Sequence, residues 1–318
     1  MSQYEKITVG EAEQKNAGQY EHVHSSRHYL FSLSDLERAE ACQIDFWLPH
    51  PSAERLFKKI DLMMSMKGKT VAPCLLCLGA GGLGKTSAIT ELKRRNAMSS
   101  QKIIFVTMHQ NADSYNLKEL IFDKMGLDVS RRARQSKKIT PELQYIIKSQ
   151  NIKAIVIDEV HDAFTLSPFQ RRVNLSLMKN LSGETYGLSV FAFGVPDGAR
   201  HLREDPQLAR RYSVHQLESW ENGDSFRNFV FSYIHRLPLK KSTDYRDQRL
   251  LLTIMEKALG ITDNIVKMLQ AAAWAAIADG TERITLDHIM NIEEIMSDLG
   301  YGLQGLDEVD GGVQKQWA

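Results

Sequence analysis

The chain has 318 residues, enough for one large or two modest domains, and its hydrophobic (43%) and charged (25%) fractions are those of ordinary globular proteins. The formal net charge is +1, so the composition excludes a broadly basic protein, and any nucleic-acid contact must come from a local patch. The first residues lack the apolar core of a signal peptide, and no apolar run is long enough to span a bilayer. We therefore expect a cytoplasmic protein without a membrane segment.

Four regions follow one another along the chain. Residues 1–44 are polar and weakly patterned and are expected to form an N-terminal extension. Residues 45–221 alternate apolar runs with helical patterns, which predicts an α/β domain. Residues 222–299 contain helical patterns only, which predicts a small helical domain, and residues 300–318 form a tail.

The regular elements can be placed from the hydrophobic pattern. A helix is expected to begin at Pro51 and to end at Gly68. Helical patterns separate the apolar runs that follow, so the sheet should be parallel and covered on both faces. The expected strands are 74–78, 103–106, 154–159, 188–194 and 212–217. The expected helices of the C-terminal region are 226–237, 246–259, 265–278 and 286–299.

A glycine-rich loop joins the first expected strand to the next helix. It matches the phosphate-loop pattern G-x-x-x-x-G-K-[ST] at every fixed position, in the strand–loop–helix context that this motif requires. Glycines let the backbone wrap a phosphate, and the N–H groups of the loop and of the helix N-terminus face the anion. Lys85 would reach the β- and γ-phosphates, and the Thr86 hydroxyl would bind Mg²⁺. The predicted nucleotide-binding residues here are Gly79, Gly81, Gly82, Gly84, Lys85 and Thr86.

Two carboxylates end the third expected strand. Asp158 is expected to hold Mg²⁺, and Glu159 to orient and activate the attacking water, since phosphoryl transfer needs mainly positioning and charge neutralisation. Residues 158–161 also spell a D-E-x-H box, but little chain remains for the second motor domain of a helicase. We interpret His161 as a surface or sensing residue. The sequence has no N-K-x-D pattern for guanine, which favours ATP over GTP.

Cys74 and Cys77 form a C-x-x-C pair inside the first expected strand. Positions three apart on a strand point to opposite faces, and no second Cys or His pair completes a zinc site. We interpret both as core residues.

Three stretches together resemble a known family. They are the phosphate loop, the strand end Ile157–His161, and Val190–Gly194 followed by Asp205–Tyr212. These stretches, with Asp45–Pro51, are similar to AAA+ ATPases of the TniB/TnsC family of transposition regulators. The resemblance implies an AAA+ fold, with a parallel sheet flanked by helices and followed by a helical lid. It also implies a homo-oligomeric ring or filament on duplex DNA that links target selection to the transposase, with a TniQ-type target-selection protein as a further partner.

The resemblance also assigns an arginine. Arg211 matches the arginine before an aromatic residue that acts in trans on a neighbour's nucleotide, and Arg210 is its substitute. The alternative for Arg211 is a residue that caps helix carbonyls. Two positions depart from the family pattern. Val195 follows Gly194 where a polar sensor is usual, so the sensor is absent or moved to Asp197, and Asn264 occupies the place of a lid arginine.

DNA contact is expected at two places, without sequence readout because phosphate contacts carry none. The first is the loop with His109 and Asn111, with Lys118 beyond it. The second is a basic run that includes Arg131, Arg132, Arg134, Lys137 and Lys138. The sequence thus predicts an ATP- and Mg²⁺-dependent regulator of DNA transposition. The alternative is a nucleotide-switched signalling or scaffold ATPase that needs no DNA.

Overall fold

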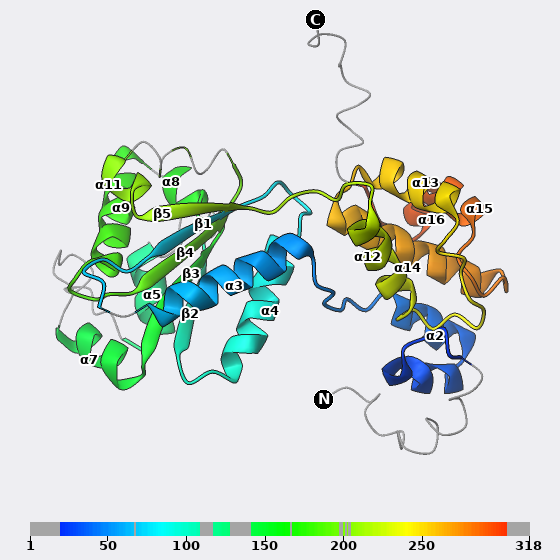
Figure 1. Cartoon of the computed structure of the whole chain (residues 1–318), viewed down its shortest axis with the longest axis horizontal. Coiled ribbons are helices and arrows are strands. Elements are labelled where there is room, and N and C mark those ends of the chain that lie inside the picture. Colours follow the sequence, from blue (N-terminus) through cyan, green and yellow to red (C-terminus); the bar gives the residue numbers. More distant parts are fainter. Residues whose placement is uncertain are drawn as a thin grey trace, which may run out of the picture. The chain divides into compact units, whose positions relative to one another are not determined.

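The structure is a computed structural model that describes residues 20–303, except 67, 109–116, 128–140, 166, 197–199, 201, 203 and 204. Its contacts divide the chain into two compact units (Figure 1). One unit is Pro51–Glu218. The other combines the described residues up to His50 with those from Ser219 onward.

The first unit is built on a five-stranded parallel sheet, as the apolar runs predict. The strands are β1 (Cys74–Leu78), β2 (Lys102–Thr107), β3 (Ile152–Asp158), β4 (Ser189–Gly194) and β5 (Tyr212–Gln216). Their order across the sheet is β2-β3-β4-β1-β5. Strand β4 therefore separates β1 from β3, and the carboxyl ends of all three meet at one edge.

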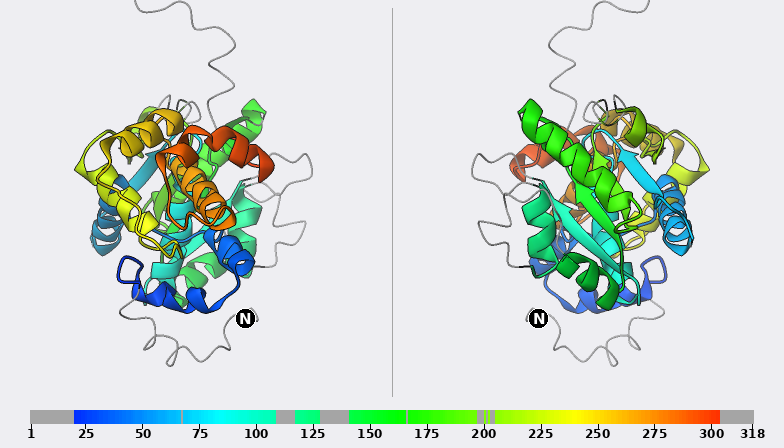
Figure 2. Two further views of the ribbon diagram at one scale, coloured as in Figure 1. Left: turned by 90° about the vertical axis from the view of Figure 1, so that its right-hand side faces the viewer. Right: turned by 90° about the vertical axis from the view of Figure 1, so that its left-hand side faces the viewer.

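Helices cover both faces of this sheet (Figures 1 and 2). Cys74, Leu76 and Leu78 pack into a core cluster with residues of the helices on one face. Their neighbours Leu75 and Cys77 point the other way, because side chains alternate along a strand. The helices on the side of Cys74 are α5 (Leu117–Lys124), α7 (Pro141–Ser149), α8 (Asp162–Thr165) and α9 (Pro168–Ser182), and those on the other side are α3 (Pro51–Ser65) and α4 (Lys85–Ala97).

The C-x-x-C pair thus consists of two buried free thiols on opposite faces of the sheet. Burial raises the pKa of both, and that of Cys77 reaches about 12. Both are core residues, as expected. A thiol buried in apolar surroundings stays protonated and is therefore unreactive.

The second unit is helical. Its core consists of apolar side chains from all the long helices, with α14 at the centre, where Ile265, Met268 and Leu269 are fully buried. The expected single helix 286–299 is broken at Asn291. The helices are η2 (Ser25–Ser32), α2 (Asp35–Cys42), α12 (Asp224–Ile234), α13 (Gln248–Ala258), α14 (Thr262–Ala278), α15 (Leu286–Met290) and α16 (Ile292–Asp298).

The described part of the expected N-terminal extension belongs to this helical unit. Helix α2 begins with a capping box, in which the Ser34 hydroxyl accepts from Glu37 N and the Glu37 carboxylate accepts from Ser34 N. It packs against α14 through Ala39 and Cys42. The sequence boundary at residue 44 therefore does not coincide with the boundary of the compact units, which lies at His50.

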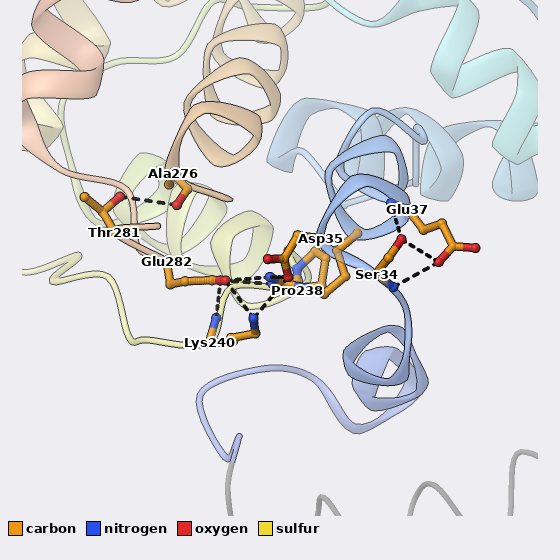
Figure 3. A network of polar contacts seen from close by, with 9 residues as sticks. Ser34, Asp35, Glu37, Pro238, Lys240, Ala276, Thr281 and Glu282 are labelled. Carbon is orange, nitrogen blue, oxygen red and sulfur yellow. Dashed lines mark hydrogen bonds and ion pairs between the residues drawn. The ribbon is translucent and has the colours of Figure 1, made fainter. Parts of the chain in front are cut away.

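A polar network ties α2 to the C-terminal part of the unit (Figure 3). Arg38, with no exposed surface, donates two hydrogen bonds to Glu282 and one to the Pro238 carbonyl. Lys240 adds an ion pair and a backbone N–H to the same carboxylate. Figure 3 shows contacts from segments far apart in the sequence that converge on the Glu282 carboxylate.

Among the helices that the structure describes, none is long and apolar enough to cross a lipid bilayer.

Candidate functional site

The glycine-rich loop follows β1 directly and leads into α4. Gly84 takes the N-cap position of α4 with φ +86°, and Gly82 has φ +70°, both in the left-handed region that glycine adopts without strain. The buried Lys85 ammonium donates to the carbonyls of Gly79 (2.8 Å) and Ala80 (3.0 Å). An ammonium carries three donors, so a third can reach an anion held in the loop. Thr86 is exposed on the first turn of α4.

Asp158 ends β3 and is 8% exposed. Its Oδ1 accepts a hydrogen bond from Glu159 N at 2.9 Å. Burial raises the pKa of this carboxyl, while the charge of Lys85 acts in the opposite direction. A buried carboxylate that is costly to ionise fits a bound cation, because the cation would offset the cost of desolvation.

The end of β4 joins the loop to this carboxylate. Gly79 N donates to Gly194 O at 3.2 Å, and Val160 N donates to Phe193 O at 2.8 Å. Successive carbonyls of one strand thus fix both segments. The structure places Lys85, Asp158 and Glu159 at the same edge of the sheet.

Glu159 starts a tight turn after β3. Its φ of +50° is left-handed, a conformation that costs a non-glycine residue about 1 kcal/mol or more. The turn is closed by Asp162 N, which donates to Glu159 O at 3.0 Å. Nδ1 of His161 lies 3.2 Å from Oε2 of Glu159. The sequence indicated only a surface or sensing role for His161, whereas the structure places its ring against the carboxylate expected to activate water.

Arg211 and Arg210 lie at the opposite edge of the sheet. Arg211 O accepts from Cys74 N, at the start of β1. The Arg211 guanidinium donates to Lys179 O (2.8 Å) and Ser182 Oγ (3.1 Å), which caps the C-terminal turn of α9. Arg210 is exposed, and within the described ranges its side chain makes no hydrogen bond or ion pair.

The two positions that depart from the family pattern lie in different units. Asn264 is fully buried in the helical unit, where its Nδ2 donates to Ala258 O at 3.3 Å, across the turn between α13 and α14. This packing gives Asn264 a structural role in the lid. Val195 is half-buried after β4, and Asp197 lies outside the described residues.

Of the expected DNA contacts, the structure describes Lys118 alone. It lies on α5, its ammonium is 5.5 Å from the centre of the Phe122 ring, and burial lowers its pKa. The remaining candidates fall outside the described ranges, namely His109, Asn111, Arg131, Arg132, Arg134, Lys137 and Lys138.

Solved structures with this fold include proteins described with DNA. A structure of Drosophila ORC bound to DNA matches with TM-score 0.57 at 13% identity, covering 89% of this chain and 70% of that chain. The Aeropyrum pernix ORC1 protein in complex with DNA matches with TM-score 0.55 at 15% identity, covering 82% and 70%. A Walker-type ATPase of Pyrococcus abyssi matches with TM-score 0.52 at 13% identity, covering 84% and 76%. At these identities the likeness shows the fold.

Sequence comparison gives the family. No curated protein matches the chain in sequence. The profile of a family described as bacterial TniB protein matches residues 38–222, which include the loop, Asp158, Glu159 and both arginines. Since this match spans more than half of the chain, the protein belongs to the TniB family and is an AAA+ ATPase.

Proposed function

We propose that this ATPase regulates DNA transposition, and that ATP controls its assembly on duplex DNA. One observation carries the proposal. The phosphate loop and two carboxylates lie at one edge of the sheet, and an exposed arginine lies at the other. Family membership supports the link to transposition, and two proteins of the same fold are described with DNA.

The nucleotide site uses the loop and the end of β3. The loop glycines and Lys85 hold the phosphates of ATP, with Lys85 supplying a point charge. Thr86 and Asp158 would hold Mg²⁺, which prefers few protein ligands together with phosphates and water. When bound there, the cation would supply positive charge against the charge that develops on the phosphates. Glu159 takes a proton from the attacking water with its partly exposed carboxylate, which follows Asp158 directly in the chain.

A second copy completes the site. Strand β1 has five residues and spans about 13 Å at a rise of about 3.3 Å per residue, and the loop and the arginines lie at its opposite ends. Arg210 therefore serves a nucleotide bound to a neighbouring copy, whereas Arg211 is engaged by Lys179 O and Ser182 Oγ in its own subunit. Hydrolysis then requires a ring or filament.

DNA provides the surface on which copies assemble. Lys118, His109, Asn111 and the basic run 131–138 supply the contacts to phosphates, and these contacts read no sequence. The assembled ATPase connects a TniQ-type target-selection protein to the transposase.

Assembly on DNA tests this proposal. Light scattering or electron microscopy would follow wild-type protein with duplex DNA, Mg²⁺, and either ATP or no nucleotide. We expect assembly with ATP only. Glu159→Gln should bind ATP and form longer-lived assemblies, because water activation is lost while the phosphate and metal ligands remain.

Lys85→Ala is the matched negative variant. It should bind ATP at least about tenfold more weakly, since a charge-assisted contact to phosphate is lost, and it should not assemble. Lys58→Ala, which replaces an exposed lysine of α3 in the same unit, should behave as wild type. ATP-dependent assembly of wild type without DNA would instead favour the signalling or scaffold ATPase.

A further inference from the structure

The ring of His161 lies between two carboxylates after β3. Nδ1 is 3.2 Å from Oε2 of Glu159, and Nε2 is 3.6 Å from Oδ1 of Asp162. The His161 side chain is 23% exposed and the Glu159 side chain 36%. The histidine is thus the more buried of the two side chains.

The backbone around His161 is fixed by the end of β4. Val160 is fully buried and bonded to Phe193 O, and Phe164 N donates to His161 O at 2.9 Å. A Cβ added to Gly194 would lie 3.1 Å from Val160 Cγ1 and 3.6 Å from His161 Nδ1. A glycine at this position therefore lets Val160 pack closely against the strand end, and the imidazole lies beside the same strand end.

The Nδ1 atom is buried and, in the part of the chain described, has no hydrogen bond of good geometry. A buried polar atom without a partner costs about 1–3 kcal/mol, and such atoms are rare in native proteins. The nearby Glu159 oxygen can only accept, so the contact requires a proton on Nδ1. Hydrogen bonds of catalytic groups are often poorly aligned before substrate binds and tighten afterwards.

We propose that His161 is a positioning residue for Glu159: its Nδ1–H holds Oε2, which leaves Oε1 to accept the proton of the attacking water. The inference rests on the proposed role of Glu159. The left-handed backbone of Glu159 and the fixed turn bring the carboxylate to His161, and His161 then sets its rotation. Without that contact a half-exposed glutamate samples several rotamers, of which few face the water.

Steady-state ATP hydrolysis on duplex DNA, together with nucleotide affinity by calorimetry, tests the inference. His161→Ala should lower kcat by about 10-fold to 100-fold, while KM and the dissociation constant for ATP stay within about twofold. His161→Asn should recover most of the rate, because its amide nitrogen takes the place of Nδ1. His161→Gln extends its nitrogen one bond further and should recover less. His215→Asn is the matched control in the same unit.

A double variant separates positioning from packing. In the Glu159→Gln background, His161→Ala should cause no further loss of kcat, because residues acting through one group are not additive. An additional loss there, or equal losses in the Ala and Asn variants, would overturn the inference. If His161→Ala does not fold, kcat of His161→Asn is compared with kcat of His161→Gln. A higher kcat in His161→Asn supports the inference, and equal losses would overturn it.

The outcomes also separate this inference from the proposed function. Parental kcat in His161→Ala, with hydrolysis lost in Glu159→Gln, would overturn the role of His161 alone. A parental rate in Glu159→Gln would overturn the assigned base and with it the inference. Absence of hydrolysis by wild type with Mg²⁺ and DNA would overturn both.

Discussion

Arg38 and Glu282, separated by 244 positions, form a two-bond ion pair inside the helical unit, with N···O distances of 2.9 and 2.5 Å. Arg38 has no exposed surface, and the Glu282 side chain is 8% exposed. The contact with Arg38 lowers the pKa of Glu282 against the effect of burial, so the carboxylate stays ionised. The pair fastens the N-terminal helix α2 to the segment between α14 and α15.

Breaking this pair should destabilise the helical unit strongly. Arg38→Met leaves Glu282 charged and buried, which costs about 3–5 kcal/mol. Replacing both residues, in Arg38→Met with Glu282→Met, should recover most of the loss, because an apolar pair of similar volume has no charge to desolvate. Urea unfolding followed by circular dichroism measures these differences.

Lys240 supplies the control for that measurement. Its side chain is 40% exposed and contacts the same carboxylate, so Lys240→Ala should cost less than about 1 kcal/mol. Equal losses in the Lys240 and Arg38 variants would contradict a dominant role for the buried pair.

The sequence predicted the nucleotide loop, Asp158 and the five strands because each depends on neighbours in the chain. Apolar runs specify buried strands, and glycines allow the loop conformation. It did not predict the place of Arg38, because an isolated arginine carries no periodic signal and its partner is remote. The family pattern favoured Arg211 for action in trans, with Arg210 as its substitute. In the structure the Arg211 side chain bonds to Lys179 O and Ser182 Oγ. These two residues are remote in the sequence and come near Arg211 only through the fold.

Glu91 gives the α/β unit a pH-dependent contribution to stability. Its 3%-exposed carboxylate accepts from Arg94 and Arg95, and Arg95 also bonds Glu54 on α3. Hydrogen bonds from Arg94, followed by the other charged contacts, lower the pKa of Glu91 to about 2 despite burial. A lowered folded-state pKa stabilises above the unfolded value of 4.5, and the contribution is lost as pH falls from there towards 2.

Glu91→Gln should therefore reduce the free energy of unfolding by about 1–3 kcal/mol near neutral pH. The difference between wild type and variant should shrink at about pH 3, where the unfolded-state carboxyl is protonated and the advantage of the folded state is partly lost. Urea unfolding at both pH values measures it. A difference that does not change with pH would contradict the role of the Glu91 charge.

The two arginines at the amino edge should respond differently to alanine. Arg210→Ala should bind ATP normally. If the Arg210 charge acts on a neighbour's nucleotide, the variant should hydrolyse ATP at about one thousandth of the parental rate or below. Arg211→Ala should mainly lower the thermal stability, since it removes the cap of α9. ATP turnover and thermal unfolding of both variants distinguish the two roles.

Mixing subunits tests action in trans. Lys85→Ala binds nucleotide poorly and Arg210→Ala lacks the acting arginine. Some interfaces in a mixture therefore combine an intact nucleotide site on an Arg210→Ala subunit with the arginine of a Lys85→Ala subunit. Turnover should rise above that of either variant alone. Intact assembly without such recovery would argue against a site shared between copies, and full loss of turnover in Arg211→Ala at parental stability would return the role to Arg211.

Binding to duplex DNA should depend on ATP, ignore sequence and weaken steeply with salt. Each neutralised phosphate adds about 0.9 to the slope of log affinity against log salt concentration. With a net charge of +1, a single copy is a poor ligand for DNA, so affinity should come from many copies acting together.

Fluorescence anisotropy across a salt series measures this slope. The slope should be reduced for Lys118→Gln, and for neutral replacements in the basic run 131–138, if these residues touch phosphates. Lys58→Gln removes the same charge from the exposed face of α3 and should leave the slope unchanged. Tight binding without ATP, or no binding to any duplex at low salt with ATP, would contradict assembly on DNA as the controlled step.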